Sequence, residues 1–296
     1  MDLLPLDQAL REAARQLTAA GVGPARAEAE VLVAHLTGRS RGEVVADAVL
    51  GRPAPQGLAA LVARRALREP LQHLTGTAPF RDIELLVGPG VFVPRPETEQ
   101  VAEVAVRSAR QVLAEHGRVV VVDLCAGSAA IALAVEAEVP GAVVHAVELD
   151  AEAVAWARRN LDRRGSDVRL VRADARTALR DLDGTVDVVV SNPPYIPGDA
   201  VPRDPEVRDH DPQVALYGLG PDGLTVPRGV IGAAARLLRP GGVLVMEHAE
   251  VQASAVRRAV EASGVFVDVR TLPDLTGRDR MVVARVGRRH VKDSPP

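Results

Sequence analysis

The sequence predicts an α/β protein in which a doubly wound, mainly parallel sheet follows a small helical domain. Strand and helix patterns alternate between residues 119 and 247, as is typical of a parallel sheet with crossover helices. Residues 1–75 show helical periodicity and no strand pattern, which indicates a separate bundle. A chain of 296 residues is long enough for one large domain and one small domain.

The N-terminal region is expected to form three helices. The helical spacing of apolar residues predicts them at residues 6–20, 24–37 and 58–70. Gly21 and Gly38 follow the first two, and a Pro/Gly-rich break precedes the third. Nothing in these helices suggests catalysis, so the region either docks a partner or braces the larger domain.

A β-hairpin is expected to link the two domains over residues 76–96. The first part alternates weakly, and Gly88-Pro89-Gly90 is expected to turn the chain into a second strand at residues 91–93. A stiff proline-rich segment then leads into a helix at residues 97–115. Its acidic residues suit the positive end of that helix, with a wall over a bound cofactor as the alternative role.

The remaining elements follow from local periodicity and from glycine and proline positions. Strands are expected at residues 119–124, 143–148, 168–174, 186–190, 243–247, 265–270 and 281–286, the last two antiparallel at the sheet edge. Helices are expected at residues 128–138, 151–164, 225–239 and 251–263. Residues 197–224 hold five prolines and four glycines, and so long a connection favours a loop over a site.

Composition argues against several classes of protein. The net charge of −3, with one Trp, two Tyr and three Phe, argues against stable nucleic-acid binding. The start lacks a signal-peptide pattern, and no apolar run is long enough to span a membrane, so the cytoplasm is the expected location. Cys125 is the only cysteine, which excludes an intramolecular disulfide. No metal is expected, because the seven histidines show no metal-ligand spacing with acidic neighbours.

The segment Ser191-Asn192-Pro193-Pro194-Tyr195 follows the strand expected at residues 186–190. Ligands of open α/β sheets bind beyond the carboxyl ends of the strands, so this segment is predicted to be the rigid rim of a site. A polar residue followed by two prolines presents acceptors without competing N–H groups. The alternative is a strand-ending Pro-Pro turn with a surface tyrosine.

The chemistry of the tetrapeptide Asn192-Pro193-Pro194-Tyr195 suits a planar nitrogen. An amide or an aromatic amine is a poor nucleophile because its lone pair is delocalised, until its two N–H bonds are held. The Asn192 side-chain carbonyl and the Pro193 backbone carbonyl can accept those bonds. Tyr195 can stack on the planar group and exclude water.

The loop after the first strand of the sheet lacks the glycine pattern of a dinucleotide site. Its residues are Asp123, Leu124, Cys125, Ala126, Gly127, Ser128 and Ala129. A carboxylate at the strand end is unfavourable for a pyrophosphate and favourable for an ammonium group. S-adenosylmethionine has no phosphate and carries both an ammonium and a sulfonium, so it meets these conditions.

Acidic residues also end the next two predicted strands. Glu148 is placed to accept from the two ribose hydroxyls, and Asp174 from the adenine amino group. Each acid alone could be a helix N-cap or a solvated loop carboxylate. Three successive strand ends with an acid, beside the tetrapeptide at the fourth, predict a methyltransferase.

These residues resemble the bacterial peptide chain release factor glutamine methyltransferases over nearly the whole chain. The shared motifs are Glu69–Gly76, Val93–Glu99, the glycine loop, Ser191–Ile196, Pro221–Leu224 and Asp274–Arg280. The tetrapeptide alone is shared with methyltransferases acting on adenine or guanine amino groups. The segment Pro94-Arg95-Pro96-Glu97, together with the helical N-terminal domain, is much more specific.

The resemblance implies a Rossmann-like, seven-stranded methyltransferase core that methylates the glutamine side-chain amide in the Gly-Gly-Gln motif of release factors. It implies that Asn192, Pro193, Pro194 and Tyr195 bind the glutamine. The residues assigned to the cofactor are Asp123, Cys125, Ala126, Gly127, Ser128, Ala129, Glu148, Asp174, Ala175 and Asn192. We expect a monomer with a partner-binding domain at residues 1–75, a linker at 76–96, a catalytic domain at 97–287 and a disordered tail at 288–296.

Two positions depart from the family pattern. Cys125 and Ala129 stand where the family often has glycine, and a positive φ at Ala129 would cost about 1 kcal/mol. The expected mechanism is direct in-line transfer without a general base, with Asn192, Pro193 and Tyr195 as the catalytic residues. The alternatives are methylation of a nucleic-acid base, methylation of another protein's glutamine, and a non-catalytic binding module that has lost its cofactor.

Overall fold

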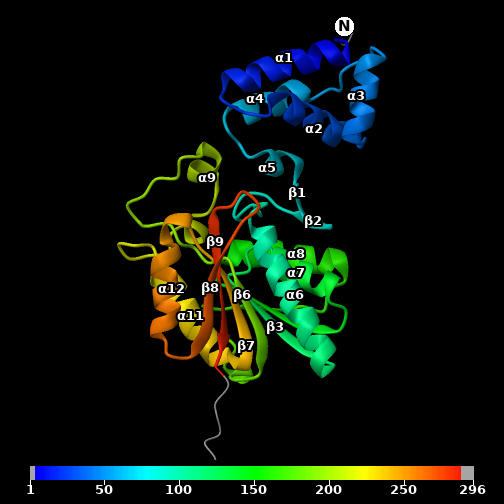
Figure 1. Cartoon of the computed structure of the whole chain (residues 1–296). Coiled ribbons are helices and arrows are strands. Elements are labelled where there is room, and N and C mark those ends of the chain that lie inside the picture. Colours follow the sequence, from blue (N-terminus) through cyan, green and yellow to red (C-terminus); the bar gives the residue numbers. More distant parts are fainter. Residues whose placement is uncertain (1–3, 288–296) are drawn as a thin grey trace, which may run out of the picture. The chain divides into compact units, whose positions relative to one another are not determined.

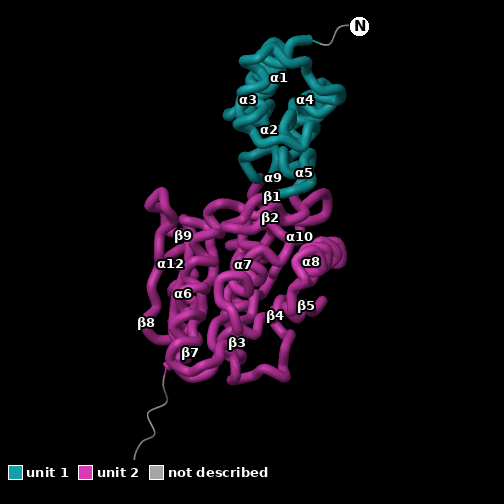
Figure 2. Tube along the Cα trace, turned by 90° about the vertical axis from the view of Figure 1, so that its right-hand side faces the viewer, with its two compact units in different colours: residues 1–77, 202–210 teal, residues 78–201, 211–296 magenta. Residues whose placement is uncertain are grey.

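The computed structural model describes residues 4–287 and divides them into two compact units (Figure 1). Unit 1 runs up to Thr77 and includes Pro202–His210, whereas unit 2 comprises Ala78–Val201 and the chain from Asp211 onward (Figure 2). The tail predicted to be disordered, residues 288–296, lies outside the described residues. No helix within residues 4–287 combines the length and the apolar character needed to cross a membrane.

Unit 1 is a helical bundle. Its helices are α1 (Leu6–Ala19), α2 (Ala25–Thr37), α3 (Arg41–Val49), α4 (Leu58–Ala66), α5 (Leu71–Thr75) and α9 (Pro205–His210). Leu10, Leu17 and Leu32 are completely buried at its centre, as the helical spacing of apolar residues in α1 and α2 predicts. The bundle therefore has a core of its own.

Helix α3 is not indicated by apolar periodicity, because only Val44 and Ala48 of its residues are buried. Its start is specified by a capping box instead. The Glu43 N–H donates to Ser40 Oγ at 3.3 Å, and the Ser40 N–H donates to Glu43 Oε2 at 2.9 Å. The spacing of serine and glutamate is the signal in the sequence that identifies this helix.

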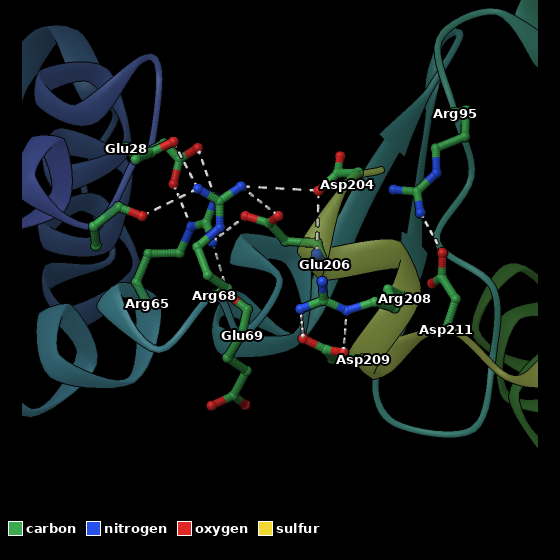
Figure 3. A network of polar contacts seen from close by, with 12 residues as sticks. Glu28, Arg65, Arg68, Glu69, Arg95, Asp204, Glu206, Arg208, Asp209 and Asp211 are labelled. Carbon is green, nitrogen blue, oxygen red and sulfur yellow. Dashed lines mark hydrogen bonds and ion pairs between the residues drawn. The ribbon is translucent and has the colours of Figure 1, made fainter. Parts of the chain in front are cut away.

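Helix α9 is held in unit 1 by ion pairs, although its sequence lies within the long loop after the tetrapeptide. Arg65 Nη1 donates to Glu206 Oε1 and Arg68 Nη2 donates to Glu206 Oε2, both at 2.6 Å (Figure 3). Arg65 Nε donates to Glu28 Oε2 at 2.5 Å. Only 7% of the Arg65 side chain and 12% of the Glu206 side chain are exposed, so these charges are paired out of water.

The predicted linker hairpin is present, but its strands and its turn differ from the prediction. Strands β1 (Thr77–Phe80) and β2 (Ile83–Leu86) pair across a turn at Arg81. Arg81 adopts a positive φ of 51°, and its guanidinium pairs with Glu138 and Glu103. The prediction of a second strand at residues 91–93 is wrong, because the alternation there reflects burial in the core and not pairing with a strand.

Unit 2 contains a seven-stranded sheet of order β5-β4-β3-β6-β7-β9-β8. Its strands are β3 (Val119–Leu124), β4 (Ala142–Glu148), β5 (Arg169–Arg172), β6 (Val186–Ser191), β7 (Leu238–Glu247), β8 (Phe266–Pro273) and β9 (Asp279–Val286). Strand β9 is antiparallel to both β7 and β8, and the other pairings are parallel. The predicted fold class, including the antiparallel edge, is confirmed.

Helices cover both faces of this sheet (Figure 1). One face packs against α6 (Thr98–His116), α7 (Ala130–Glu138) and α8 (Ala151–Arg164), and the other against α11 (Thr225–Leu237) and α12 (Ala253–Ala262). The loop predicted at residues 197–224 contains the short helices α9 and α10 (Gln213–Leu216). The main difference in bounds is that β7 begins at Leu238, five residues earlier than predicted, and so includes Pro240-Gly241-Gly242.

Candidate active site

The carboxyl ends of the central strands lie side by side. Leu124 of β3 is paired with Val147 of β4 and with Ser191 of β6, and Ser191 is paired with Met246 of β7. Ser191 Oγ also donates to the Leu124 carbonyl at 2.6 Å. The residues that follow these positions, including Asn192, therefore meet at one edge of the sheet, where ligands of open α/β sheets bind.

Asn192 is held by a chain of hydrogen bonds that the sequence did not indicate. Its Nδ2 donates to Thr98 Oγ1 at 3.1 Å, and Thr98 Oγ1 donates to Glu247 Oε2 at 2.8 Å. The Tyr195 hydroxyl donates to the other oxygen, Glu247 Oε1, at 3.3 Å. One carboxylate at the end of β7 therefore connects two residues of the tetrapeptide.

The backbone of the tetrapeptide is held by Gln252 and Gly223. Gln252 Nε2 donates to the Tyr195 carbonyl at 2.8 Å and to the Asp222 carbonyl at 2.9 Å. A Cβ atom at Gly223, which has a φ of +68°, would lie 2.3 Å from the Tyr195 carbonyl oxygen. Only glycine allows this approach, so Gly223 and Gln252 together fix the path of the chain after Pro193 and Pro194.

The loop between β3 and α7 has left-handed backbone at three positions. Cys125, Gly127 and Ala129 have φ values of 63°, 55° and 66°. The Ala126 N–H donates to the Val147 carbonyl at 3.0 Å, which ties the loop to β4. Because two of the three left-handed residues carry a Cβ, the loop holds backbone strain at the positions where the sequence departs from glycine.

Glu148 and Asp123 accept from backbone N–H groups of this loop and of the helix that follows it. Glu148 accepts from the N–H groups of Gly127 at 2.8 Å, Leu149 at 2.7 Å and Asp150 at 2.8 Å. Asp123 Oδ2 accepts from the Ala132 N–H of α7 at 3.1 Å, whereas Asp123 Oδ1 is buried and has no hydrogen-bond partner among residues 4–287. Burial raises the pKa of Asp123 to about 8 and also raises the pKa of Glu148.

These two acids fit S-adenosylmethionine. A buried carboxylate oxygen without a partner suits the ammonium of the methionine group, because unsatisfied buried acceptors are costly. A carboxylate has about four acceptor sites, so Glu148 keeps capacity for a hydroxyl. Within residues 4–287, no group of three or more His, Cys, Asp or Glu side chains is arranged to hold a metal ion.

Asp174 lies beyond the end of β5, but it already has a cationic partner. Arg176 donates to Asp174 Oδ2 at 2.6 Å and to Asp174 Oδ1 at 2.9 Å. The hydrogen bond with Arg176 lowers the pKa of Asp174. Arg176 lies against Gly229 of α11, where a Cβ would be 2.4 Å from Arg176 Cδ, and the neighbouring Ala175 is buried. The expected acceptor for an adenine amino group therefore remains ionised and carries an arginine.

Sequence reasoning missed three residues of this site: Thr98, Glu247 and Gln252. Glu247 ends a predicted strand, so the rule applied to the other strand ends would have identified it. Thr98 is 94 residues away from Asn192 in the chain, and only the fold brings the two together. Gln252 precedes a helix, and nothing in its sequence context indicates that it binds the tetrapeptide backbone.

The sheet order and the strand-end acids define an S-adenosylmethionine-dependent methyltransferase. The solved structure of the hMettl16 catalytic domain in complex with MAT2A 3'UTR hairpin 6 has a similar fold, with a TM-score of 0.52 and 15% identity, and the match covers 80% of this chain and 84% of that chain. The family described as methyltransferase small domain matches residues 102–204, and the family described as PrmC N-terminal domain matches residues 8–76.

Curated relatives identify the family of methyltransferases to which this chain is similar. The release factor glutamine methyltransferase of Streptomyces coelicolor is 50% identical over 277 residues, which cover 93% of this chain and 95% of that protein. A 4-amino-L-phenylalanine/4-methylamino-L-phenylalanine methyltransferase of Streptomyces pristinaespiralis is 43% identical over 263 residues, 88% of each chain. This chain belongs to the family of release factor glutamine methyltransferases.

Proposed function

We propose that this protein methylates the side-chain amide nitrogen of the glutamine in the Gly-Gly-Gln motif of peptide chain release factors. The observation that carries the proposal is the hydrogen bond from Asn192 Nδ2 to Thr98, which leaves Asn192 Oδ1 as an acceptor for the substrate. The similarity to release factor glutamine methyltransferases over 93% of the chain supports the same substrate. We further propose that the protein acts as a cytoplasmic monomer and forms no stable complex with nucleic acid.

The chain's own residues orient the glutamine. Asn192 Oδ1 and the Pro193 carbonyl accept the two N–H bonds of the substrate amide, which directs the nitrogen lone pair toward the cofactor. The Tyr195 ring covers the planar group and excludes water. Correct orientation of reacting groups can supply up to about 7 to 11 kcal/mol of the barrier.

The transfer needs no general base. When bound, S-adenosylmethionine supplies an electrophilic methyl group on a sulfonium. With the amide nitrogen held by Asn192 and Pro193, the methyl group would pass to that nitrogen, the sulfur would keep the electron pair of the broken bond, and water would take the proton that the nitrogen loses. A neutral nucleophile and a cation combine in this step, so charge is dispersed. The residues assigned to the cofactor are the loop from Asp123 to Ala129, Glu148, and Asp174 with Ala175.

A second candidate is a small aromatic amine. The relative from Streptomyces pristinaespiralis is named for 4-amino-L-phenylalanine, and 43% identity over 88% of the chain is close to that of the release factor relatives. The nitrogen of an aniline is planar and delocalised, like that of an amide, so the same two acceptors suit it. Two further alternatives, a nucleic-acid amino group and another protein's glutamine, share this chemistry.

The test is mass spectrometry of candidate substrates after incubation with this protein and S-adenosylmethionine. A purified release factor, 4-amino-L-phenylalanine and total RNA are treated in parallel. A mass gain of one CH₂ group on the Gly-Gly-Gln peptide supports the proposal, whereas methylation of the amino acid or of RNA alone selects that alternative. Calorimetry with the cofactor identifies a non-catalytic module, which would show no binding.

A further inference from the structure

The carboxylate of Glu247 is buried beside the tetrapeptide and takes no direct part in the methyl transfer. Only 2% of the residue is exposed, and its two oxygens accept from the hydroxyls of Thr98 and Tyr195. The charged and titratable groups that face it are Arg280 from β9, Glu97 beside the start of α6, and Tyr195. Its position is set by the end of β7, where Met246 is paired with Ser191.

The chain of bonds from Glu247 to Asn192 has a fixed direction. An ionised carboxylate can only accept hydrogen bonds, so the single hydroxyl proton of Thr98 points toward Glu247. The Thr98 oxygen can then only accept from Asn192, and the Asn192 amide must turn its Nδ2 toward Thr98. Asn192 Oδ1 then lies at the other end of the amide group, away from Thr98, where it can accept a hydrogen bond from a substrate.

The opposite orientation of the Asn192 amide would prevent binding of the substrate. With Oδ1 on Thr98, Asn192 Nδ2 would face the N–H groups of the substrate amide, donor against donor. Nothing within the Asn192 side chain decides between the two orientations, because the two ends of an amide have almost the same shape. The choice therefore depends on Thr98 and, through it, on Glu247.

We propose that Glu247 and Thr98 are positioning residues for the methyl transfer. Through the Thr98 hydroxyl, the Glu247 carboxylate determines which end of the Asn192 amide faces the substrate nitrogen. The same carboxylate also holds the Tyr195 ring in place by accepting from the Tyr195 hydroxyl. This inference rests on the proposed function, because it assigns roles within the same site. Neither residue touches the reacting atoms.

Arg280 completes the arrangement by supplying the positive charge that faces Glu247. Asp274 pairs with Arg280 at 3.3 Å and accepts from the N–H groups of Thr276 at 2.8 Å and Arg278 at 3.1 Å. The Arg280 carbonyl accepts from the His248 N–H at 2.9 Å, which fixes β9 beside the residue that follows Glu247. Segments from α6, β6, β7 and β9 thus converge on one carboxylate.

The test compares Thr98→Val, which removes the hydroxyl at nearly constant volume, with Thr98→Ser, which keeps it. In single-turnover methylation of a release factor, Thr98→Val is expected to slow the rate roughly 100-fold, as misorientation of a reacting group does. S-adenosylmethionine affinity by calorimetry stays close to that of the parent, whereas the melting temperature falls, because Glu247 Oε2 loses its donor. Thr98→Ser is expected to recover most of the rate. Equal rates for Val and Ser would overturn the inference.

A second measurement decides the inference even if the parent protein does not methylate release factors. The Asn192 side-chain amide is observed by ¹⁵N NMR and assigned from its loss in Asn192→Asp. The bond to Thr98 predicts slow hydrogen exchange of one Nδ2 proton in the parent and in Thr98→Ser, and fast exchange in Thr98→Val. Exchange that Thr98→Val leaves unchanged would contradict the positioning role. An inactive parent would refute only the proposed substrate.

Discussion

Units 1 and 2 each contain a glutamate whose side chain is largely shielded from water, but the surroundings of the two carboxylates are opposite. Glu206 of unit 1 has a guanidinium on each oxygen, Arg65 on one and Arg68 on the other (Figure 3). Although burial acts to raise its pKa, hydrogen bonds with Asp204, Arg68 and Arg65 lower it. Among the described residues, Glu247 of unit 2 accepts from two hydroxyls, those of Thr98 and Tyr195. Burial raises its pKa to about 7 in spite of Thr98 and Arg280.

This difference separates an anchor from a functional carboxylate. A buried acid that is fully paired with arginines holds a segment in place, here α9. A deeply buried acid whose hydrogen bonds come only from neutral hydroxyls lowers stability, so its presence indicates a task that requires it. Backbone strain at Cys125 and Ala129 belongs to the same unit as Glu247. Both costs to stability therefore occur at the candidate active site.

Glu206→Ala should have the largest effect on stability. The substitution removes the carboxylate from Arg65 Nη1 and Arg68 Nη2, although Arg65 keeps its pair with Glu28. Breaking a shielded ion pair on one side costs roughly 3 to 5 kcal/mol. Urea unfolding of the whole chain measures the loss. Asp209→Ala on the same helix is the matched control, because the Arg208–Asp209 pair is exposed and solvent screens it. Equal effects of the two substitutions would remove the distinction between anchor and surface pair.

Glu247→Gln should change how stability depends on pH. The pKa of the folded state, about 7, lies above the ordinary value of 4.5, so the folded chain retains the proton more strongly than the unfolded chain between these values. The free energy of unfolding therefore falls as pH rises through this window, by up to about 3 kcal/mol. The glutamine variant lacks this loss and should gain stability over the parent at pH 8 but not at pH 4.

The activity of the same variant should move in the other direction. The parent needs ionised Glu247 to direct the Thr98 proton, so its single-turnover rate should rise with pH through about 7. In Glu247→Gln that rise disappears, and the rate at pH 8 falls below that of the parent. Burial also raises the pKa of Asp123, to about 8. Comparing the pH profiles of the rates of parent and variant separates the effect of Glu247 from that of Asp123, which both proteins contain. A parent rate that does not vary between pH 6 and 8 would contradict this account.

Ala129→Gly should have the smallest effect. Ala129 has a φ of 66°, and glycine relieves a left-handed strain of about 1 kcal/mol, partly offset by its greater freedom in the unfolded chain. We expect a small rise in the melting temperature measured by calorimetry. Ala126→Gly is the control, since Ala126 is not among the residues with positive φ and glycine there should destabilise. A fall in both variants would show that the loop is unstrained at Ala129.

The sequence predicts those parts of the site that lie at the ends of strands. Asp123, Glu148 and Asn192 follow runs of valine whose periodicity is local, and parallel strands bring their ends together whatever the rest of the chain does. Glu247 obeys the same rule, because it ends β7 beside Asn192, and applying the rule to the fifth strand would have identified it.

Other features depend on contacts between distant segments, which local patterns do not contain. Thr98 reaches Asn192 from the start of a helix, and Gln252 reaches the Tyr195 carbonyl from just before α12. The strand wrongly expected at residues 91–93 shows the converse error: Val91 and Val93 are completely buried, and alternating burial imitates the pattern of a paired strand.

The most direct test of the central claim is mass spectrometry of a release factor treated with S-adenosylmethionine and either the parent protein or Asn192→Ala. The account predicts a gain of one CH₂ group on the glutamine of the Gly-Gly-Gln peptide. It also predicts that Asn192→Ala slows this reaction roughly 100- to 1,000-fold, the cost of removing one oriented acceptor, without weakening cofactor binding. An Asn192→Ala protein that methylates the peptide as fast as the parent would contradict the assignment of Asn192 as the residue that holds the substrate nitrogen.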